Sequence, residues 1–461
     1  MSFDPEIAAV RFGFGLGPRS APVQSTTGML EALRGADTQA AMLPIPGFVE
    51  TYPDILEIRG LGRARRAAKD KGKTDFDAAQ KALQVKRREM RRKRNAWFLA
   101  SLSRASMAED TFRERLVRFW SDHFTAIGKG NQFEYLGTTF TEDAIRPHIA
   151  GRFADMLKAS STHPVMLYYL DQFASAGENS KLAQKGKRSL NENLGREILE
   201  LHTLGVEGGY TQTDVRAFAN LLAGFTLKKT GKAGFDHKKG NPGAETVLGK
   251  SYGTTTPRVE DVMEALDDLA RHPDTARHIA RKLATHFVAD TPDPDLVAQI
   301  EQAFLASDGD LVTVYEAMLD HPAAWSRDLQ KVKQPFDFVA SSLRALDVSH
   351  EALETRTPKE RNLMLLGSLK LMGQAWGRPS GPDGWPEDAR NWITPQGLAA
   401  RIQWSMTAPP VLTTPLPDPR EFVTTALGSL AGDTTLFAAR AAETRTEGVG
   451  MILSSPEFQK R

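Results

Sequence analysis

Cysteine is absent from the 461-residue chain. Disulfides, zinc–thiolate sites, iron–sulfur clusters and cysteine nucleophiles are therefore excluded. Long apolar runs are lacking as well, since no stretch of about 18 apolar residues occurs, and we expect no membrane-spanning helix. Residues 1–17 lack the basic region followed by an apolar region that marks a secretory signal. The sequence therefore predicts a soluble protein without a leader of its own, cytoplasmic by this criterion.

The chain also lacks an overall excess of one charge. Its formal net charge is +2 at pH 7, which argues against a polyanion-binding surface spread over the whole molecule. The charge is unevenly placed, however. Residues 63–94 contain fourteen Lys or Arg and four Asp or Glu, so one segment is strongly basic.

The basic segment predicts a long helix over 81–98. Leu83, Met90 and Trp97 recur every seven residues and define a narrow apolar stripe. One interpretation is nucleic-acid or anionic-lipid binding through residues 81–94. The other is a solvated helix whose arginine stems cover a neighbour. We favour the second, because no nucleic-acid motif accompanies the segment.

Most of the remaining sequence has the 3.6-residue apolar period of helices. Helices are expected over roughly 258–271, 274–289, 295–307, 310–320, 333–346, 361–374, 395–405, 419–430 and 446–454. Three His-Pro pairs, at 163, 272 and 321, are predicted to begin helices because Pro suits the first helical turn. The segment 225–253 is rich in Gly and Lys and predicts a small β-ribbon or irregular loop. The expected fold is a mainly α, irregular multi-helix domain over 1–461, with 1–224 and 254–461 as two lobes around this insertion.

The most informative stretch runs from Asn191 to Asp214. On a helix, four polar residues share one face at i, i+3, i+4 and i+7, namely Asn193, Arg196, Glu197 and Glu200. Gly205 is a natural end for that helix. Thr211 and Asp214 have the spacing of a capping box that begins the next helix. The pattern predicts a helix, a tight turn and a second helix.

Glu197 and Glu200 lie one turn apart, so burial of the pair would raise the pKa of at least one carboxyl. Carboxyls of unequal pKa are what general acid–base chemistry requires. Together with histidines they could also bind a divalent metal. The alternative is a solvated polar face. His202 follows Glu200 by two residues, which turns it about 200° away on a straight helix.

A second candidate lies in the run Phe119 to Phe124. Trp120 and His123 are three residues apart and point the same way from an apolar helix face. A histidine in this setting is either a catalytic or ligand residue or a satisfied core residue. The sequence leaves both roles open.

Several ordered motifs together resemble the bacterial family catalogued as domain of unknown function 1800. They are the run 119–124, Ile145-Arg146-Pro147-His148, residues 163–171, the stretch 191–211, Asp236-His237, Gly384-Trp385-Pro386 and the closing Ser454-Ser455-Pro456-Glu457-Phe458. The resemblance covers nearly the whole chain and implies no established activity. Its members are similar to exported proteins and are often encoded beside a family that looks like sulfatases and alkaline phosphatases. It therefore implies a sulfatase- or phosphatase-like partner protein, and a periplasmic or envelope location if the two are exported together.

The favoured hypothesis is a hydrolase or lyase that acts on a glycan-like polymer. Its predicted catalytic residues are Glu197, Glu200, His123 and His202. Its predicted substrate-binding residues are Trp120, Asn193, Arg196, Tyr210, His237 and Trp385. No cofactor is required by this hypothesis. The alternatives are a non-catalytic scaffold or partner, a protein that binds a divalent metal through its carboxylates, and a nucleic-acid-binding protein, the last disfavoured.

Overall fold

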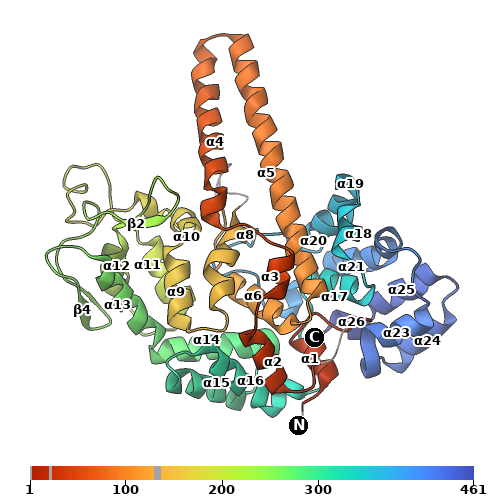
Figure 1. Cartoon of the computed structure of the whole chain (residues 1–461). Coiled ribbons are helices and arrows are strands. Elements are labelled where there is room, and N and C mark those ends of the chain that lie inside the picture. Colours follow the sequence, from red (N-terminus) through yellow and green to blue (C-terminus); the bar gives the residue numbers. More distant parts are fainter. Residues whose placement is uncertain (1–2, 20–22, 129–135) are drawn as a thin grey trace.

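The computed structural model describes residues 3–19, 23–128 and 136–461, and its chain is mainly helical (Figure 1). The predicted mainly α class is confirmed. Within the described ranges, no helix is both long enough and apolar enough to cross a membrane. The helices form a broad body from which one helical hairpin projects (Figure 1).

The α-helices of the first half are α1 (Pro5–Arg11), α2 (Thr26–Arg34), α3 (Thr38–Met42), α4 (Phe48–Ala67), α5 (Lys73–Met107), α6 (Thr111–His123), α8 (Gly137–Phe140), α9 (Phe153–Thr162), α10 (Pro164–Tyr169), α11 (Asn193–Glu197) and α12 (Gln212–Leu222). Those of the second half are α13 (Val259–Ala270), α14 (Pro273–Phe287), α15 (Pro294–Ala306), α16 (Leu311–Asp320), α17 (Pro335–Ala345), α18 (His350–Glu354), α19 (Pro358–Arg361), α20 (Gly367–Leu371), α21 (Pro395–Thr407), α22 (Pro409–Leu412), α23 (Pro419–Leu427), α24 (Asp433–Ala441), α25 (Arg445–Ser454) and α26 (Pro456–Gln459). Three segments are π-helical: η2 (Thr141–Ile145), η5 (Ile198–Thr203) and η7 (Asn362–Leu366). Short 3₁₀ turns are η1 (Ala68–Asp70), η3 (Arg146–His148), η4 (Gln172–Ala174), η6 (Pro322–Trp325), η8 (Ala389–Asn391) and η9 (Gly428–Leu430).

The three His-Pro pairs begin helices, as predicted. In each, the histidine is the N-cap residue, and its Nδ1 accepts a hydrogen bond from the backbone amide two residues later. The distances are 3.2 Å at His163, 3.1 Å at His272 and 3.2 Å at His321. The imidazole therefore caps the helix N-terminus as a Ser or Asp side chain would, while the proline supplies the fixed φ of the first turn.

Two hydrophobic clusters form the main core. One joins apolar side chains from Ile7 to Leu329, and the other joins Phe14 and part of α5 with side chains from Phe336 to Phe458. Helices α13 to α16 pack in the first cluster with α6 to α12, and the second cluster contains side chains from Phe336 onward. Helix α5 contributes side chains to both clusters.

A buried ion pair joins α6 to α17. The guanidinium of Arg115 contacts the carboxylate of Asp337, and it also donates to the carbonyl of Gly13 at 2.7 and 3.1 Å. Asp337 is buried, yet its pKa is lowered to about 2, because Arg115 and other nearby cations outweigh the effect of burial. The ion pair thus connects α6 of the first cluster with α17 of the second.

The segment 225–253 forms two small antiparallel hairpins, which confirms the predicted β-ribbon. Strand β1 (Phe225–Leu227) pairs with β2 (Ala233–Phe235), and β3 (Glu245–Val247) pairs with β4 (Lys250–Tyr252). Leu248 and Gly249 form the β3–β4 turn with φ of +51° and +80°, the backbone that a tight two-residue hairpin requires.

The projecting hairpin consists of α4 and α5 (Figure 1). The helix predicted over 81–98 exists, and it extends to Lys73–Met107. Leu83 and Met90 of the predicted stripe are buried against Ile58 of α4. The hairpin therefore has an apolar seam of its own, beyond the two core clusters.

Candidate functional site

The stretch from Asn191 to Asp214 folds as a helix, a turn and a helix, as predicted. Gly205 has a φ of +85°, and Thr211 and Asp214 form the capping box of α12. The first helix differs from the prediction in one respect. It is α-helical only over Asn193–Glu197 and continues as the π-helix η5. A π-turn is wider than an α-turn and often occurs at functional sites, because it turns side chains to new directions.

The predicted polar face is only partly assembled. Asn193 is exposed, and Arg196 is held by Glu192 at 3.1 Å and by Gln212 at 2.9 Å. Glu197 and Glu200 are half-buried. Burial and then the neighbouring Glu200 raise the pKa of Glu197.

Two tyrosines and a third carboxylate surround these glutamates. Burial, followed by Glu197 and Asp383, raises the pKa of Tyr169 to about 12. Burial and then Glu200 raise the pKa of Tyr210. The arrangement is a half-buried acidic cluster with phenol groups at its edge.

His123 and His202 meet in the core. Their ring centroids are 6.1 Å apart, and Nε2 of His123 donates to the carbonyl of His202 at 3.2 Å. His278 of α14 joins them at 6.2 Å from His123 and donates to the carbonyl of Leu201 at 3.1 Å. His202 therefore lies against the other helices from within the π-helical segment, away from Glu197 and Glu200.

These histidines are neutral at pH 7. Burial is the main cause in each case, and the cation of Lys282 adds to it. The pKa of His202 falls to about 3 and that of His278 to about 4, and the pKa of His123 is also lowered. Proton exchange by these rings near neutral pH is disfavoured by their surroundings.

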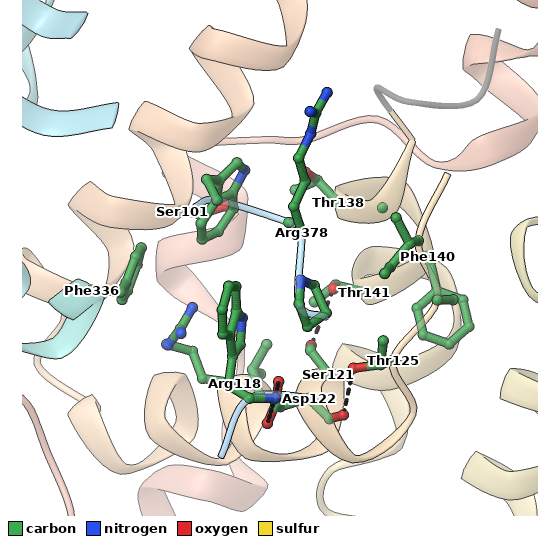
Figure 2. A pocket seen from close by; sticks show the side chains of 18 of the residues that line it. Ser101, Arg118, Ser121, Asp122, Thr125, Thr138, Phe140, Thr141, Phe336 and Arg378 are labelled. Atoms are coloured by element: carbon green, nitrogen blue, oxygen red, sulfur yellow. Dashed lines mark hydrogen bonds between the residues drawn. The ribbon is translucent and has the colours of Figure 1, made fainter. Parts of the chain in front are cut away.

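A cavity of about 160 Å³ lies beside this region, where α5, α6, η2, α17 and the segment 374–385 meet (Figure 2). Its aromatic lining residues are Phe140, Phe336, Trp376 and Trp385, and its charged lining residues are Arg94, Glu114, Arg118, Asp122, Glu142, Arg146 and Arg378. Ser121, Thr125 and Thr141 add hydroxyl groups. Four arginines, three carboxyls and flat apolar rings thus surround one space, as in many ligand sites.

Asp122 differs from the other carboxyls of the cavity in its hydrogen-bond partner and in its pKa. Both of its oxygens accept from the backbone amide of Trp385, at 3.0 and 3.1 Å. Burial raises its pKa to about 7, and the nearby Glu387 acts in the same direction. The Trp385 amide and the cations Lys282 and Arg118 oppose the rise. Asp122 can therefore take up or release a proton near neutral pH.

The other two carboxylates of the cavity are ion-paired. Glu114 makes two hydrogen bonds with Arg146, at 2.8 and 2.9 Å. Glu142 accepts from Arg104 at 2.8 Å. Both glutamates therefore serve to hold arginines in place.

Lys282 links Asp122 to the histidines. It is half-buried on α14, and burial lowers its pKa, while Asp122, Glu387 and Asp383 partly restore it. The same lysine lowers the pKa of Asp122 and of the three histidines. A charge on Lys282 thus favours an ionised Asp122 and neutral imidazoles.

The predicted aromatic residues occupy different surroundings. Trp120 is fully buried, and its indole donates to the hydroxyl of Tyr315 at 2.6 Å, so it packs in the core. Trp385 is half-buried and lines the cavity. His237 is exposed beside the β-ribbon, with Nδ1 donating to the carbonyl of Pro257 at 2.7 Å.

Among the predicted site residues, Trp385 lines the cavity. Glu197 and Glu200 lie in their own cluster, and His123 and His202 lie in the core behind the cavity. Among the described residues, no group of three or more His, Asp or Glu could hold a metal ion.

A family model described as "Protein of unknown function (DUF1800)" matches residues 7–460. The chain belongs to this family. Comparisons with curated proteins and with solved structures return no match. The DUF1800 match includes both core clusters, the stretch from Asn191 to Asp214 and the cavity.

Sequence reasoning on this DUF1800 chain missed the roles of Asp122, His278, Lys282 and Glu387. One signal was available. His278, Lys282 and His286 are spaced by four residues, so they form a polar stripe on one face of α14. Such a stripe on a helix that is otherwise apolar on that side indicates a buried polar site. Asp122 lies within the motif from Phe119 to Phe124, but its sequence context gives no sign of the Trp385 amide that binds it.

Proposed function

We propose that this DUF1800 protein is a lyase that cleaves an acidic polysaccharide, with Asp122 as its proton-transferring group. One observation carries the proposal. Asp122 is the cavity carboxyl held by a backbone amide, whereas Glu114 and Glu142 are each held by an arginine.

The cavity favours a lyase over a hydrolase. Most glycoside hydrolases need two cooperating carboxyls, one on each side of the scissile bond. A lyase needs one proton-transferring group and cations that neutralise the carboxylate of the sugar. Asp122, with Arg118 and Arg378 in the same lining, supplies that smaller set (Figure 2).

In the proposed elimination, Asp122 alone both removes and returns the proton. Its carboxylate takes the proton from the carbon next to the sugar carboxylate. The electrons of that C–H bond form a C=C bond, and the C–O bond on the neighbouring carbon breaks. Asp122 then returns its proton to the departing oxygen, so the carboxyl regains its starting form. A carboxyl with a pKa near the working pH suits both transfers.

The aromatic lining would bind the sugar rings. Trp376 stacks on Phe336 with ring centroids 5.3 Å apart, and the guanidinium of Arg118 lies 3.8 Å from the centre of the Phe336 ring. Stacked aromatic and guanidinium groups are rigid, and the cation remains close to the space that a sugar carboxylate would enter.

The test is a spectroscopic assay on polygalacturonate, alginate and hyaluronan, with a neutral glucan as the control polymer. A lyase product contains a C=C bond conjugated with a carboxylate, which absorbs ultraviolet light. Asp122→Asn should lower turnover about 100-fold or more, the usual contribution of a general acid or base. Asp383→Asn, which removes an exposed carboxylate close by, is the matched control.

Three results would contradict the proposal. New reducing ends without ultraviolet absorbance would indicate hydrolysis. Absence of cleavage of every acidic polymer would argue for a non-catalytic protein. Loss of turnover in Glu197→Gln or Glu200→Gln, but not in Asp122→Asn, would instead assign the chemistry to the helix formed by α11 and η5.

A further inference from the structure

A second cavity, of about 340 Å³, lies on the projecting hairpin. Its lining residues come from α4, α5 and α10: Ile58, Arg59, Gly62, Arg63, Arg65, Arg66, Leu83, Arg87 and Tyr168. Five of the nine are arginines, and none is acidic. The described lining of this cleft is therefore strongly basic.

Three acidic residues of the hairpin are engaged by lysines. Asp54, Glu57 and Glu89 all contact the ammonium group of Lys86, at 2.7, 2.7 and 3.1 Å. Asp54 also pairs with Lys93 at 2.7 Å. These three carboxylates are therefore paired with Lys86 and Lys93, and none of them lines the arginine cleft.

The arginines of the cleft retain unused donors. Nε of Arg65 and Nε of Arg87 are buried, and neither has a hydrogen-bond partner among the described residues. The guanidinium of Arg59 is fixed against Tyr168, to whose hydroxyl it donates. The guanidinium groups that face the cleft could donate charge-assisted hydrogen bonds to an anionic ligand.

Helix α5 connects this cleft to the Asp122 cavity. Arg87, Arg94 and Ser101 are spaced by seven residues, so they lie along one face of the helix. Arg87 lines the cleft, while Arg94 and Ser101 line the cavity. The distance from Arg87 to Ser101 along the axis is roughly 21 Å at 1.5 Å per residue. A ligand that occupied both sites would be an oligomer.

We propose that the arginine cleft of the α4–α5 hairpin binds the anionic groups of an acidic polysaccharide and directs the chain along α5 into the cavity. The inference rests on the proposed lyase function and adds a second binding site to it. The hairpin presents no exposed aromatic side chain over 48–107, whereas proteins that bind single-stranded nucleic acids use aromatic stacking platforms. A carboxylated or sulfated polysaccharide needs no such platform on the hairpin.

The experiment measures binding by the full chain of fluorescently labelled oligogalacturonate at low salt. The test variant is Arg63→Ala/Arg66→Ala/Arg87→Ala. The control is Lys370→Ala/Arg420→Ala/Arg440→Ala, which removes the same charge from exposed positions on other helices. We expect roughly tenfold weaker binding for the hairpin variant, the combined effect of losing three charge contacts at the surface of the cleft. Its binding should also depend less steeply on salt.

A fold control accompanies the measurement. Circular dichroism and thermal unfolding establish whether the triple variant is folded, and the single variant Arg63→Glu at an exposed position tests the same site with a smaller change to the helix. Arg63→Glu is also expected to weaken binding. Unchanged binding in a folded triple variant, or an equal loss in the control variant, would overturn the inference.

Two competing ligands give further decisive outcomes. Tighter binding of single-stranded DNA than of oligogalacturonate would assign the hairpin to nucleic acid and overturn the proposal. Complete displacement of the oligomer by inorganic phosphate would assign the cleft to a small anion and also overturn it. Binding is measured in the Asp122→Asn background, so that cleavage does not consume the ligand. If the hairpin fails this test while Asp122→Asn still abolishes turnover, the lyase proposal stands and the hairpin inference falls.

Discussion

The pH dependence of stability gives a direct test of the environment assigned to Asp122. Its folded pKa of about 7 lies above the unfolded value of about 3.9. Between these values the folded state holds a proton that the unfolded state has lost. The free energy of unfolding therefore falls as the pH rises through this window and becomes constant above it. A gap of about three pKa units corresponds to a total of about 4 kcal/mol.

Asp122→Asn removes this titration and keeps the shape of the side chain. Urea unfolding of the wild type and of Asp122→Asn, at several pH values from 4 to 8.5, gives the difference between their free energies of unfolding. Relative to the variant, the wild type should lose about 4 kcal/mol between pH 4 and 7, with little further change above pH 7.5. Contributions from the other titrating groups cancel in the difference.

A difference that stays constant from pH 4 to 8.5 would refute the reasoning, since Asp122 would then titrate as an ordinary exposed carboxyl. A wild type that loses stability relative to the variant as the pH falls would reverse the sign, and it would indicate that Asp122 is ionised and stabilised by Lys282 and Arg118. Asp383→Asn shows how much of the effect comes from removing a negative charge near Lys282.

Three further predictions concern the surroundings. Lys282→Met should raise the pKa of Asp122, because the lysine now lowers it, and the window of the same unfolding titration should move to higher pH. Leu83→Ala should destabilise the hairpin by about 2–4 kcal/mol through loss of buried contacts, whereas Val85→Ala, at a position 57% exposed, should change little; amide hydrogen exchange in α4 and α5 distinguishes them. Thr211→Ala removes one half of a capping box and should cost about 1 kcal/mol in urea unfolding; an unchanged midpoint would contradict the capping role.

Most of the helical architecture could be predicted because its signals are local. The apolar period of three to four residues located α13 to α17, and the His-Pro pairs marked three helix starts. The spacing of Thr211 and Asp214 identified the beginning of α12. The lengthening of α5 to Lys73 could not be predicted in this way, since its outer turns are polar and are stabilised by packing against α4.

The π-helix at Ile198–Thr203 had no visible signal. The run Ile-Leu-Glu-Leu-His-Thr satisfies an ordinary amphipathic pattern, and the change to i→i+5 bonding depends on contacts with other helices. That change decides where His202 points. A straight α-helix places it off the face of Glu197 and Glu200, and the structure indeed takes it into the core beside His123.

The cavity could not be predicted, because its parts are remote in sequence. Asp122 and the amide that binds it are 263 residues apart. The motif around Asp122 identified Trp120 and His123 as candidates, since both share the apolar face of α6. The face of α6 that carries Trp120 and His123 packs in the core, whereas Asp122 on the same helix lines the cavity.

The polar stripe of α14 shows how the two groups of candidate residues are related. Lys282 lies near the three neutral histidines on one side and Asp122 on the other. If the lysine is charged, protonation of a histidine is opposed and ionisation of Asp122 is assisted. The lysine therefore favours neutral imidazoles at the three histidines, and it opposes the rise in the pKa of Asp122 that burial causes. Under the proposed lyase function, the helix that begins at Asn193 would act through the backbone and side chain of His202, which adjoin His123, rather than through Glu197 and Glu200.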